Sequence, residues 1–425
     1  MNTIEKYESE VRGYCRAFPV EFASAKGAWL TASDGRKYLD FFAGAGALNY
    51  GHNDDGMQQA LLAYIARDGI THSLDMFSTA KREFLERFYE VILTPRGMGD
   101  YKAQFPGPTG TNAVEAALKL ARKVTGRERV LSFTNGFHGM TLGALAVTGN
   151  AFKRQGAGVP LNNAVSMPFA GYMGDDVDTI AYLDAMLEGA GSGMDKPAAA
   201  ILETVQGEGG INVASADWLR RLAAVLKKHD VLLIVDDIQI GCGRSGRFFS
   251  FEEAGIKPDI VTLSKSLSGY GLPFAMLVFR PELDVWEPGE HNGTFRGFNP
   301  AFVTARKALD FWTNDDFAES VRRKSARAIA SLEGIAALAR GLGARVRGRG
   351  LMLGIAFETE GTAGEMAAEC FANGLVIETA GVNGDVLKLL PSLTITDTEL
   401  DMGLEIVRNA VKKVAEKQAK EKAAA

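Results

Sequence analysis

Cysteine is scarce in this chain of 425 residues, and long apolar runs are missing from it. The three cysteines, Cys15, Cys242 and Cys370, are widely spaced and form no C-x-x-C pair, which argues against a disulfide framework and against a zinc site. No run of roughly 18 apolar residues occurs, and residues 1–16 lack the basic start and apolar core of a signal peptide. We therefore expect a protein of the reducing cytoplasm that neither spans a membrane nor binds a structural metal.

An excess of positive charge is also absent, since the formal net charge is -5. Such a chain has no overall basic field that would attract nucleic acid or an anionic membrane, so we expect a small soluble molecule as its partner. With 46% hydrophobic and 23% charged residues, the composition is that of a soluble globular protein. The length exceeds that of one ordinary core and suits a large lobe with a smaller one.

The middle of the chain alternates helical segments with short apolar runs that favour β-structure. Polar or glycine-containing loops bound these runs, as expected of strands that are buried on both faces. The pattern predicts an α/β fold with a mainly parallel sheet, in which ligands bind beyond the carboxyl ends of the strands. The expected strands are residues 129–133, 199–203, 231–235, 260–263 and 274–279.

A glycine-rich loop, residues 107–112 (GPTGTN), runs directly into a strongly helix-forming segment, residues 113–122. Asn112 followed by Glu115 has the form of a capping box. Backbone N–H groups at the positive end of such a helix can bind an anion such as a phosphate. The loop is equally compatible with a plain capped helix start, because loops of this composition are common.

Two ionisable residues follow predicted strands. Asp236 follows the run 231–235, and it is either a functional carboxylate or an ordinary salt-bridged one. A magnesium-nucleotide site is disfavoured because the chain has no G-x-x-x-x-G-K-[ST] motif. Lys265 follows the run 260–263, where burial would lower its pKa and free its amine to react with an aldehyde. A surface lysine is the alternative.

A phosphate-binding loop, a carboxylate for a ring nitrogen and a lysine for an aldehyde together match one ligand, pyridoxal 5'-phosphate (PLP). Phe137 can offer an aromatic face to the ring, although ordinary core packing explains it equally well. Residues 241–246 form a competing G-x-G-x-x-G motif, which is typical of dinucleotide-binding proteins. No long helix follows it, and Asp259 precedes the next strand instead of ending it, so a dehydrogenase is disfavoured.

Several motifs, in their order along the chain, resemble those of the class III (ω-) aminotransferases, PLP enzymes of fold type I. The motifs are TGTN (109–112), FHG (137–139), ETVQGEGG (203–210), VDDIQ (235–239), SK (264–265) and NGT (292–294). The resemblance implies a large PLP-binding domain, residues 56–300, and a small domain formed by residues 1–55 and 301–425. It also implies a homodimer, or a dimer of dimers, with active sites at the subunit interface.

The same resemblance implies a role for individual residues. Lys265 forms the Schiff base with the cofactor and moves protons, and Asp236 pairs with the ring nitrogen. Phe137 stacks on the ring, and Gln239 lies near the ring hydroxyl. The implied phosphate contacts are Gly110, Thr111 and, from the neighbouring subunit, Thr294. The donor amine then leaves its nitrogen on the cofactor, from which an oxo acid collects it.

Three segments, residues 105–122, 293–297 and 387–394, resemble a narrower group within this family. That group transfers the amino group of glutamate to aspartate 4-semialdehyde, giving 2,4-diaminobutyrate in ectoine biosynthesis. Other ω-aminotransferases, acting on ornithine, on 4-aminobutyrate or on diaminobutyrate for siderophores, stay open as alternatives. So does a mutase or racemase of the same fold.

One departure from the family concerns the substrate carboxylate. Many class III members bind it with an arginine where this chain has Lys388, which offers a point charge and not a bidentate fork. Recognition is then either looser or shared with Arg296 or Arg349. In relatives Glu208 pairs with that arginine when an ω-amine is bound. Trp29 stands where relatives often place an aromatic substrate contact, although a core position is equally compatible.

Overall fold

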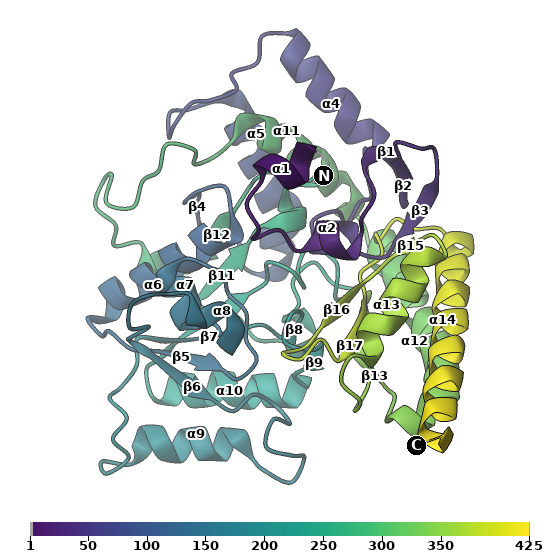
Figure 1. Cartoon of the computed structure of the whole chain (residues 1–425). Helices are drawn as coiled ribbons and strands as arrows, with labels where there is room; N and C mark the ends of the chain where they lie inside the picture. The colour runs from purple at the N-terminus through teal and green to yellow at the C-terminus, as the bar shows by residue number, and fades with distance from the viewer. Residues whose placement is uncertain (1–2, 425) are drawn as a thin grey trace.

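A seven-stranded sheet lies at the centre of the computed structural model, which describes residues 3–424 (Figure 1). All its strands are parallel except β12, which is antiparallel to both of its neighbours. In sheet order the strands are β4 (Lys102–Gln104), β12 (Met276–Phe279), β11 (Ile260–Leu263), β10 (Leu232–Asp236), β7 (Ala199–Leu202), β5 (Val130–Phe133) and β6 (Ala164–Met167).

The predicted α/β fold with a mainly parallel sheet is confirmed, and each of the expected apolar runs forms a strand of this sheet. The apolar pattern missed β4 and β6, the two strands at the edges of the sheet. Both carry an exposed polar side chain, Lys102 on β4 and Ser166 on β6. An edge strand need not be apolar on both faces, so it lacks the signal that identifies a central strand.

Neighbouring residues along a strand point to opposite faces of the sheet, and here both faces are buried. On one face Val130 and Ile234 pack in the same core as α6 (Gly110–Thr125). On the other face Leu131 and Val235 pack in the same core as α10 (Ala216–Lys228). With both faces covered, the carboxyl ends of the strands are the place where polar side chains can gather.

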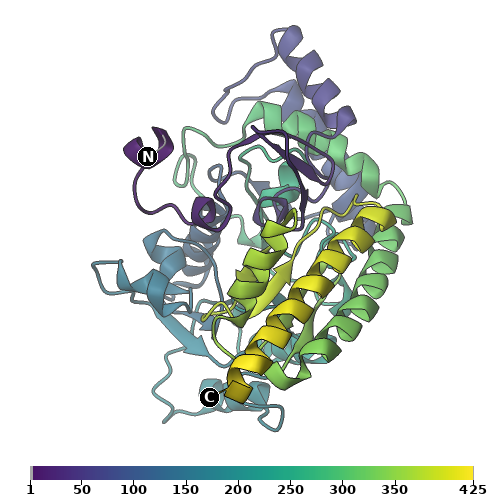
Figure 2. The same cartoon turned by 45° about the vertical axis from the view of Figure 1, so that its right-hand side comes forward.

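A smaller antiparallel sheet comes from the C-terminal part of the chain. Three long helices, α12 (Asp316–Ala336), α13 (Thr362–Ala372) and α14 (Asp397–Ala424), run side by side against it, in green and yellow in Figure 2. In sheet order its strands are β13 (Arg345–Arg349), β14 (Met352–Ala356), β17 (Val386–Leu389) and β16 (Glu378–Ala380).

The N-terminal strands join this C-terminal region, since β3 pairs in parallel with β15. That sheet consists of β1 (Phe22–Lys26), β2 (Trp29–Ala32), β3 (Lys37–Asp40) and β15 (Leu375–Val376). The pairing supports a small domain built from both ends of the chain. Its division from the large domain at residues 55 and 300 stays a prediction.

The remaining elements connect these layers or pack around them. They are α1 (Thr3–Tyr7), α2 (Tyr14–Ala17), α3 (Ala43–Gly46), α4 (Asp55–Ala66), α5 (Thr79–Phe88), η1 (Tyr89–Leu93), η2 (Thr94–Arg96), α7 (Leu142–Ala146), α8 (Ala151–Gln155), α9 (Thr179–Glu188), the pair β8 (Val205–Gln206) and β9 (Asn212–Val213), η3 (Glu252–Ala254), η4 (Lys265–Ser268), η5 (Pro281–Leu283), α11 (Asn299–Ala308), η6 (Leu309–Trp312) and η7 (Ala337–Leu342). No helix within residues 3–424 is long and apolar enough to cross a membrane.

Candidate active site

Lys265 lies just beyond the carboxyl end of β11, at the start of η4. Its backbone φ is 48°, in the left-handed region that lysine rarely adopts, so the surrounding chain imposes this conformation. Its Nζ donates a hydrogen bond of 2.8 Å to the carbonyl oxygen of Ala45 in α3. Burial lowers the pKa of Lys265, which increases the fraction of neutral, nucleophilic amine.

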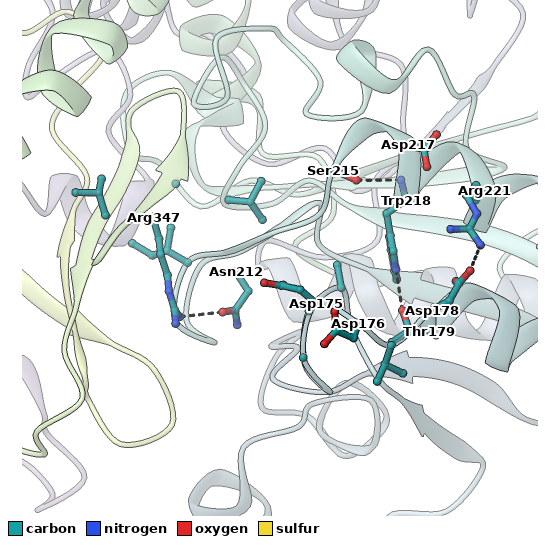
Figure 3. Close-up of a pocket in the computed structure, with 18 residues that line it drawn as sticks. Asp175, Asp176, Asp178, Thr179, Asn212, Ser215, Asp217, Trp218, Arg221 and Arg347 are labelled. Carbon is teal, nitrogen blue, oxygen red and sulfur yellow. Dashed lines mark hydrogen bonds and ion pairs between the residues drawn. The ribbon is translucent and has the colours of Figure 1, made fainter. Parts of the chain in front are cut away.

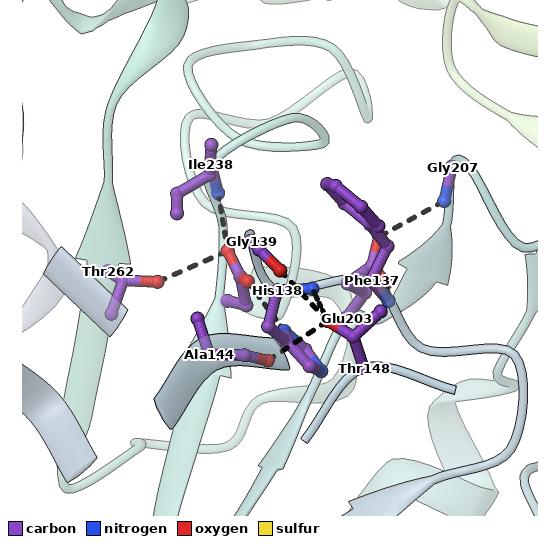
Figure 4. Close-up of polar contacts among 10 residues, drawn as sticks. Phe137, His138, Gly139, Ala144, Thr148, Glu203, Gly207, Ile238 and Thr262 are labelled. Atoms are coloured by element: carbon purple, nitrogen blue, oxygen red, sulfur yellow. Dashed lines mark hydrogen bonds and ion pairs between the residues drawn. The ribbon is translucent and has the colours of Figure 1, made fainter. Parts of the chain in front are cut away.

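Asp236 ends the neighbouring strand β10, where Thr262 of β11 is its register partner. The buried carboxylate accepts hydrogen bonds of 3.2 Å at Oδ1 from Thr262 Oγ1 and from the backbone N–H of Ile238. Its Oδ2 lies 2.7 Å from Nδ1 of His138. Figure 4 shows Thr262, Ile238 and His138 gathered around this point. A carboxylate held this firmly can keep a proton on the ring nitrogen of a ligand.

His138 is a participant that the sequence reasoning missed, although it stands within the FHG motif. Burial opposes protonation of its imidazole, yet the hydrogen bond and the charge of Asp236 raise the pKa of His138 above its usual value. His138 therefore keeps its positive charge over a wider pH range than a free histidine. The charge anchors the Asp236 carboxylate.

Glu203 is a second residue of the site to which the sequence motifs assigned no role, and it links two of those motifs. Its Oε1 accepts a hydrogen bond of 2.9 Å from the backbone N–H of Phe137, and its Oε2 accepts one of 3.1 Å from that of Gly207 (Figure 4). Burial raises the pKa of Glu203 to about 7. The half-buried Phe137 is thus fixed by a carboxylate that also holds the start of the loop leading to Glu208.

The predicted capping box at the start of α6 has the wrong residues. Thr109 is the capping residue, and its N–H and Oγ1 donate to Asn112 Oδ1 at 3.2 and 2.8 Å. Asn112 already lies in the first helical turn because the backbone turns helical directly after Thr109, which is extended at φ -120° and ψ 159°. Glu115 instead accepts hydrogen bonds from Thr141 Oγ1 and, at 3.0 Å, from the N–H of Ala144.

Gly110 and Thr111 are the first two residues of α6, so the helix itself offers no acceptor for their N–H groups. Thr111 Oγ1 lies 2.6 Å from Thr141 Oγ1. A Cβ on Gly110 would come within 3.1 Å of Ile238 Cδ1, tighter than ordinary contact. Glycine therefore lets the helix end approach the strand ends that carry Asp236 and Lys265.

Beside Lys265 lies a second cluster of charges. Lys388 Nζ donates to Glu208 Oε1 at 2.7 Å and lies 3.0 Å from Glu378 Oε1. Gln239 Nε2 donates to Glu208 Oε1 and to the carbonyl oxygen of Ala45, both at 3.0 Å. Since the Ala45 oxygen also accepts from Lys265, Gln239 connects the two clusters.

Lys388 and Glu208 hold each other ionised, whereas burial raises the pKa of Glu378 against the effect of Lys388. Burial opposes every one of these charges, but the two carboxylates raise the pKa of Lys388. Lys388 and Lys265 lower the pKa of Glu208 to about 2 against the effect of burial. Glu378 was missed from the sequence, because it belongs to no motif and only the pairing of β16 with β17 sets it opposite Lys388.

Two residues that were predicted to contact the substrate or the cofactor do not lie at this site within one chain. Trp29 Nε1 donates to Glu399 Oε1 at 2.8 Å, and its ring packs against the core of the C-terminal region. Thr294 is exposed in the loop before α11.

The two arginines considered for the substrate carboxylate have other partners. Arg296 donates to Asn292 Oδ1 at 3.0 Å, and Arg349 donates to Thr204 Oγ1 at 2.7 Å and to the carbonyl oxygen of Ser250 at 3.0 Å. Of the three cations considered, Lys388 is the one whose charge acts on Lys265 and whose partner Glu208 also accepts from Gln239.

The glycine motif 241–246 is filled by the protein itself. Arg244 is fully buried there and donates to the carbonyl oxygens of Leu351 and Pro391 and to Asn49 Oδ1. Turns follow the motif in place of a helix, so nothing here forms a dinucleotide site.

A cleft of about 760 Å³ lies away from these clusters, between residues 170–179 and β13 (Figure 3). Much of its polar lining is engaged internally. Trp218 Nε1 donates to Thr179 Oγ1 at 2.9 Å, and Arg347 donates to Asn212 Oδ1 at 3.1 Å. None of the predicted site residues lines this cleft.

The residues around Lys265 fit PLP. An amine and a carboxylate stand at the ends of adjacent strands, and a helix N-terminus lies close by. Gln239 Oε1 is buried without a hydrogen-bond partner in the described chain, so an acceptor is available for the ring hydroxyl.

Comparisons with known proteins identify the family of the chain. Diaminobutyrate–2-oxoglutarate transaminase of Halalkalibacterium halodurans is 56% identical over 416 residues, which cover 98% of this chain and 97% of the relative. The transaminase of the same name from Nocardia farcinica is 59% identical, with coverages of 96% and 94%. The crystal structure of ornithine aminotransferase from Toxoplasma gondii matches with a TM-score of 0.84 at 25% identity, over 97% of this chain and 94% of that one. Since a model of the aminotransferase class III family also matches residues 13–411, the chain belongs to the class III aminotransferases, which are PLP-dependent enzymes.

Proposed function

We propose that this enzyme transfers the amino group of glutamate to L-aspartate 4-semialdehyde, giving 2-oxoglutarate and L-2,4-diaminobutyrate, as in ectoine biosynthesis. The proposal is carried by the identity of 56% and 59%, over nearly the whole chain, to two diaminobutyrate–2-oxoglutarate transaminases. A cation beside the reacting lysine suits this reaction, because glutamate brings two carboxylates into the site. Lys388 is that cation.

Lys265 is the residue to which we assign the cofactor and the proton transfers. Bound PLP supplies an aldehyde that takes up the amino group and a ring that withdraws electrons from the substrate carbon. The lowered pKa of Lys265 makes its Nζ a base that can take a proton from that carbon, and the same group would return the proton to the former aldehyde carbon of the cofactor. The carbonyl oxygen of Ala45 holds the amine in place whenever it is free.

Asp236 is assigned to the ring nitrogen, Phe137 to the face of the ring and Gln239 to the ring hydroxyl. His138 fixes the carboxylate of Asp236, and Glu203 fixes the backbone at Phe137. These contacts come from rigid strand ends, so the ring would be held in one orientation while the amine of Lys265 moves.

The phosphate is assigned to the N–H groups of Gly110 and Thr111, the Thr111 hydroxyl and Thr294 of a second copy. A helix N-terminus favours an anion through its free N–H groups and its dipole. Phe295 beside Thr294 is 67% exposed, and Phe77 is 100% exposed. Apolar surface of this kind supports a homodimer that would bring Thr294 to the site. We place the enzyme in the cytoplasm, where its three free thiols would stay reduced.

The decisive experiment is a panel of amino donors and acceptors with the purified enzyme. The panel contains glutamate, 2,4-diaminobutyrate, ornithine and 4-aminobutyrate as donors, with aspartate semialdehyde and 2-oxoglutarate as acceptors. We expect the highest kcat/KM for glutamate with aspartate semialdehyde, and for diaminobutyrate in the reverse direction. A preference for ornithine or 4-aminobutyrate would overturn the substrate assignment but not the family. Turnover without transfer of the amino group to an oxo acid would indicate a mutase or racemase.

A further inference from the structure

The hydroxyl of Thr111, which the proposed function assigns to the phosphate, already has partners within the chain. Thr111 Oγ1 lies 2.6 Å from Thr141 Oγ1, and it accepts the backbone N–H of Thr141 at 3.4 Å. Gly139 leaves room for this pair, since a Cβ on that residue would come within 2.4 Å of Thr111 Oγ1. A phosphate that reaches the start of α6 therefore meets a hydroxyl that is not free.

Glu115 stands at the far side of Thr141 from this hydroxyl. It follows Thr111 by four positions on α6, so the two side chains lie on the same face of the helix. Its Oε1 accepts hydrogen bonds from Thr141 Oγ1 and, at 3.0 Å, from the N–H of Ala144. A Cβ on Gly143 would come within 2.2 Å of Glu115 Oε2, so glycine gives the carboxylate its place against α7. Thr141 thus connects Glu115 to Thr111.

The number of protons fixes the direction of these hydrogen bonds. A threonine hydroxyl has one proton to donate, and a carboxylate can only accept. Thr141 gives its proton to Glu115, so towards Thr111 it can act only as an acceptor. The proton of Thr111 is then directed to Thr141. Both hydroxyl protons are drawn towards Glu115, and an anion must compete for the Thr111 proton before that hydroxyl can donate to it.

We propose that Glu115 lowers the affinity of the phosphate site, because it draws the hydroxyl protons of Thr141 and Thr111 away from the phosphate. The inference rests on the proposed function, in which the phosphate is assigned to Thr111. Glu115 acts through Thr141 and does not touch the reacting atoms. Its effect matters most after the donor has left its nitrogen on the cofactor, when no bond to Lys265 retains the cofactor.

Two variants, Glu115→Gln and Thr141→Val, test the inference. A neutral amide oxygen holds the Thr141 proton less strongly than a carboxylate does. Valine keeps the shape of Thr141 but offers Thr111 no acceptor, and it leaves the charge of Glu115 in place. A gain in Thr141→Val therefore cannot come from the loss of a negative charge. Each variant frees the Thr111 hydroxyl to donate to the phosphate.

The measurement is titration calorimetry of the cofactor-free protein with pyridoxamine 5'-phosphate, which carries the phosphate but has no aldehyde to bond to Lys265. We expect the Kd to fall by roughly threefold or more in Glu115→Gln and in Thr141→Val. The Kd for pyridoxamine, which has no phosphate, should stay at the wild-type value in both variants. A general change in the fold would alter the binding of both molecules.

Three controls accompany these variants. Thr141→Ser keeps the hydroxyl and should bind pyridoxamine 5'-phosphate as the wild type does. Glu128→Gln removes an exposed carboxylate beyond the other end of α6, which closes at Thr125, and should leave the Kd unchanged. Thr111→Val combined with Thr141→Val should lose the tighter binding, because the gain requires the Thr111 hydroxyl.

Two results would overturn the inference. One is binding of pyridoxamine 5'-phosphate in Glu115→Gln and Thr141→Val that equals the wild type or is weaker. The other is tighter binding that survives in the double variant, which would show that Thr111 is not involved. Failure of the phosphate assignment itself would be visible in the wild type alone, as equal Kd values for pyridoxamine 5'-phosphate and pyridoxamine.

Discussion

The two ends of the proposed site, one assigned to the cofactor and the other to the substrate, are built differently. Lys265 and Asp236 stand at the ends of adjacent strands in one sheet, so a single backbone places both. Glu208 comes from the turn after β8, and Lys388 comes from β17 of the smaller sheet, so the packing of two regions decides where they meet. We infer that the cofactor end is rigid, whereas charges at the substrate end can change without loss of the cofactor.

Replacing Lys265 by alanine should have the largest effect. The variant loses both the group that holds the cofactor and the base, so kcat for transfer from glutamate should fall by roughly 10,000-fold or more. Steady-state kinetics with added PLP measure this loss. Lys257→Ala is the control, since this exposed lysine donates only to the carbonyl oxygen of Gly97 and should keep wild-type kcat. Retained turnover in the Lys265 variant would show that another residue does the chemistry.

Asp236→Asn should lower kcat by about 100- to 1,000-fold, because an amide cannot keep a proton on the ring nitrogen. It should also remove the attraction that raises the pKa of His138, which a histidine proton titration by NMR would record as a lowered pKa. Asp259→Asn is the matched control. Asp259 lies at the opposite end of the sheet, where it accepts from the N–H of Leu233 at 2.7 Å. That variant should lose stability but keep kcat.

The difference between the two ends of the site also explains how well each end could be predicted from the sequence. Lys265 and Asp236 could be found because apolar runs predict parallel strands, and parallel strands bring their carboxyl ends together. Glu378 could not be found, because a cross-strand partner depends on the register of β16 and β17, which no local motif encodes. Trp29 shows the same limit, since its partner Glu399 is 370 positions away along the chain.

Glu203 lies between the two ends, and it should make stability depend on pH. Its folded pKa is raised to about 7 by burial, above the ordinary value of 4.5. The folded chain then binds a proton that the unfolded chain releases. The contribution of Glu203 to the free energy of unfolding is complete below about pH 4.5 and is lost as the pH rises through 7. The free energy of unfolding changes by up to ~1.4 kcal/mol per pH unit in that range.

Denaturant unfolding of the cofactor-free protein between those pH values measures this slope. Glu203→Gln should make it shallower but not flat, because burial also raises the pKa of Asp237 to about 7. Asp237→Asn is the matched variant and should reduce the slope to a similar extent. An unchanged slope in the Glu203 variant would mean that its two N–H donors keep the carboxylate ionised in spite of burial.

Trp29→Phe should have the smallest effect, and it decides to which region Trp29 belongs. The variant loses the hydrogen bond to Glu399 but keeps most of the apolar packing, so it should cost about 1 kcal/mol of stability. Trp218→Phe loses a comparable hydrogen bond, to Thr179, far from Lys265 and should cost about as much. If Trp29 has only a structural role, the KM for glutamate and the KM for diaminobutyrate are unchanged in Trp29→Phe. If the KM for glutamate or diaminobutyrate rose in Trp29→Phe but not in Trp218→Phe, Trp29 would belong to the substrate end after all.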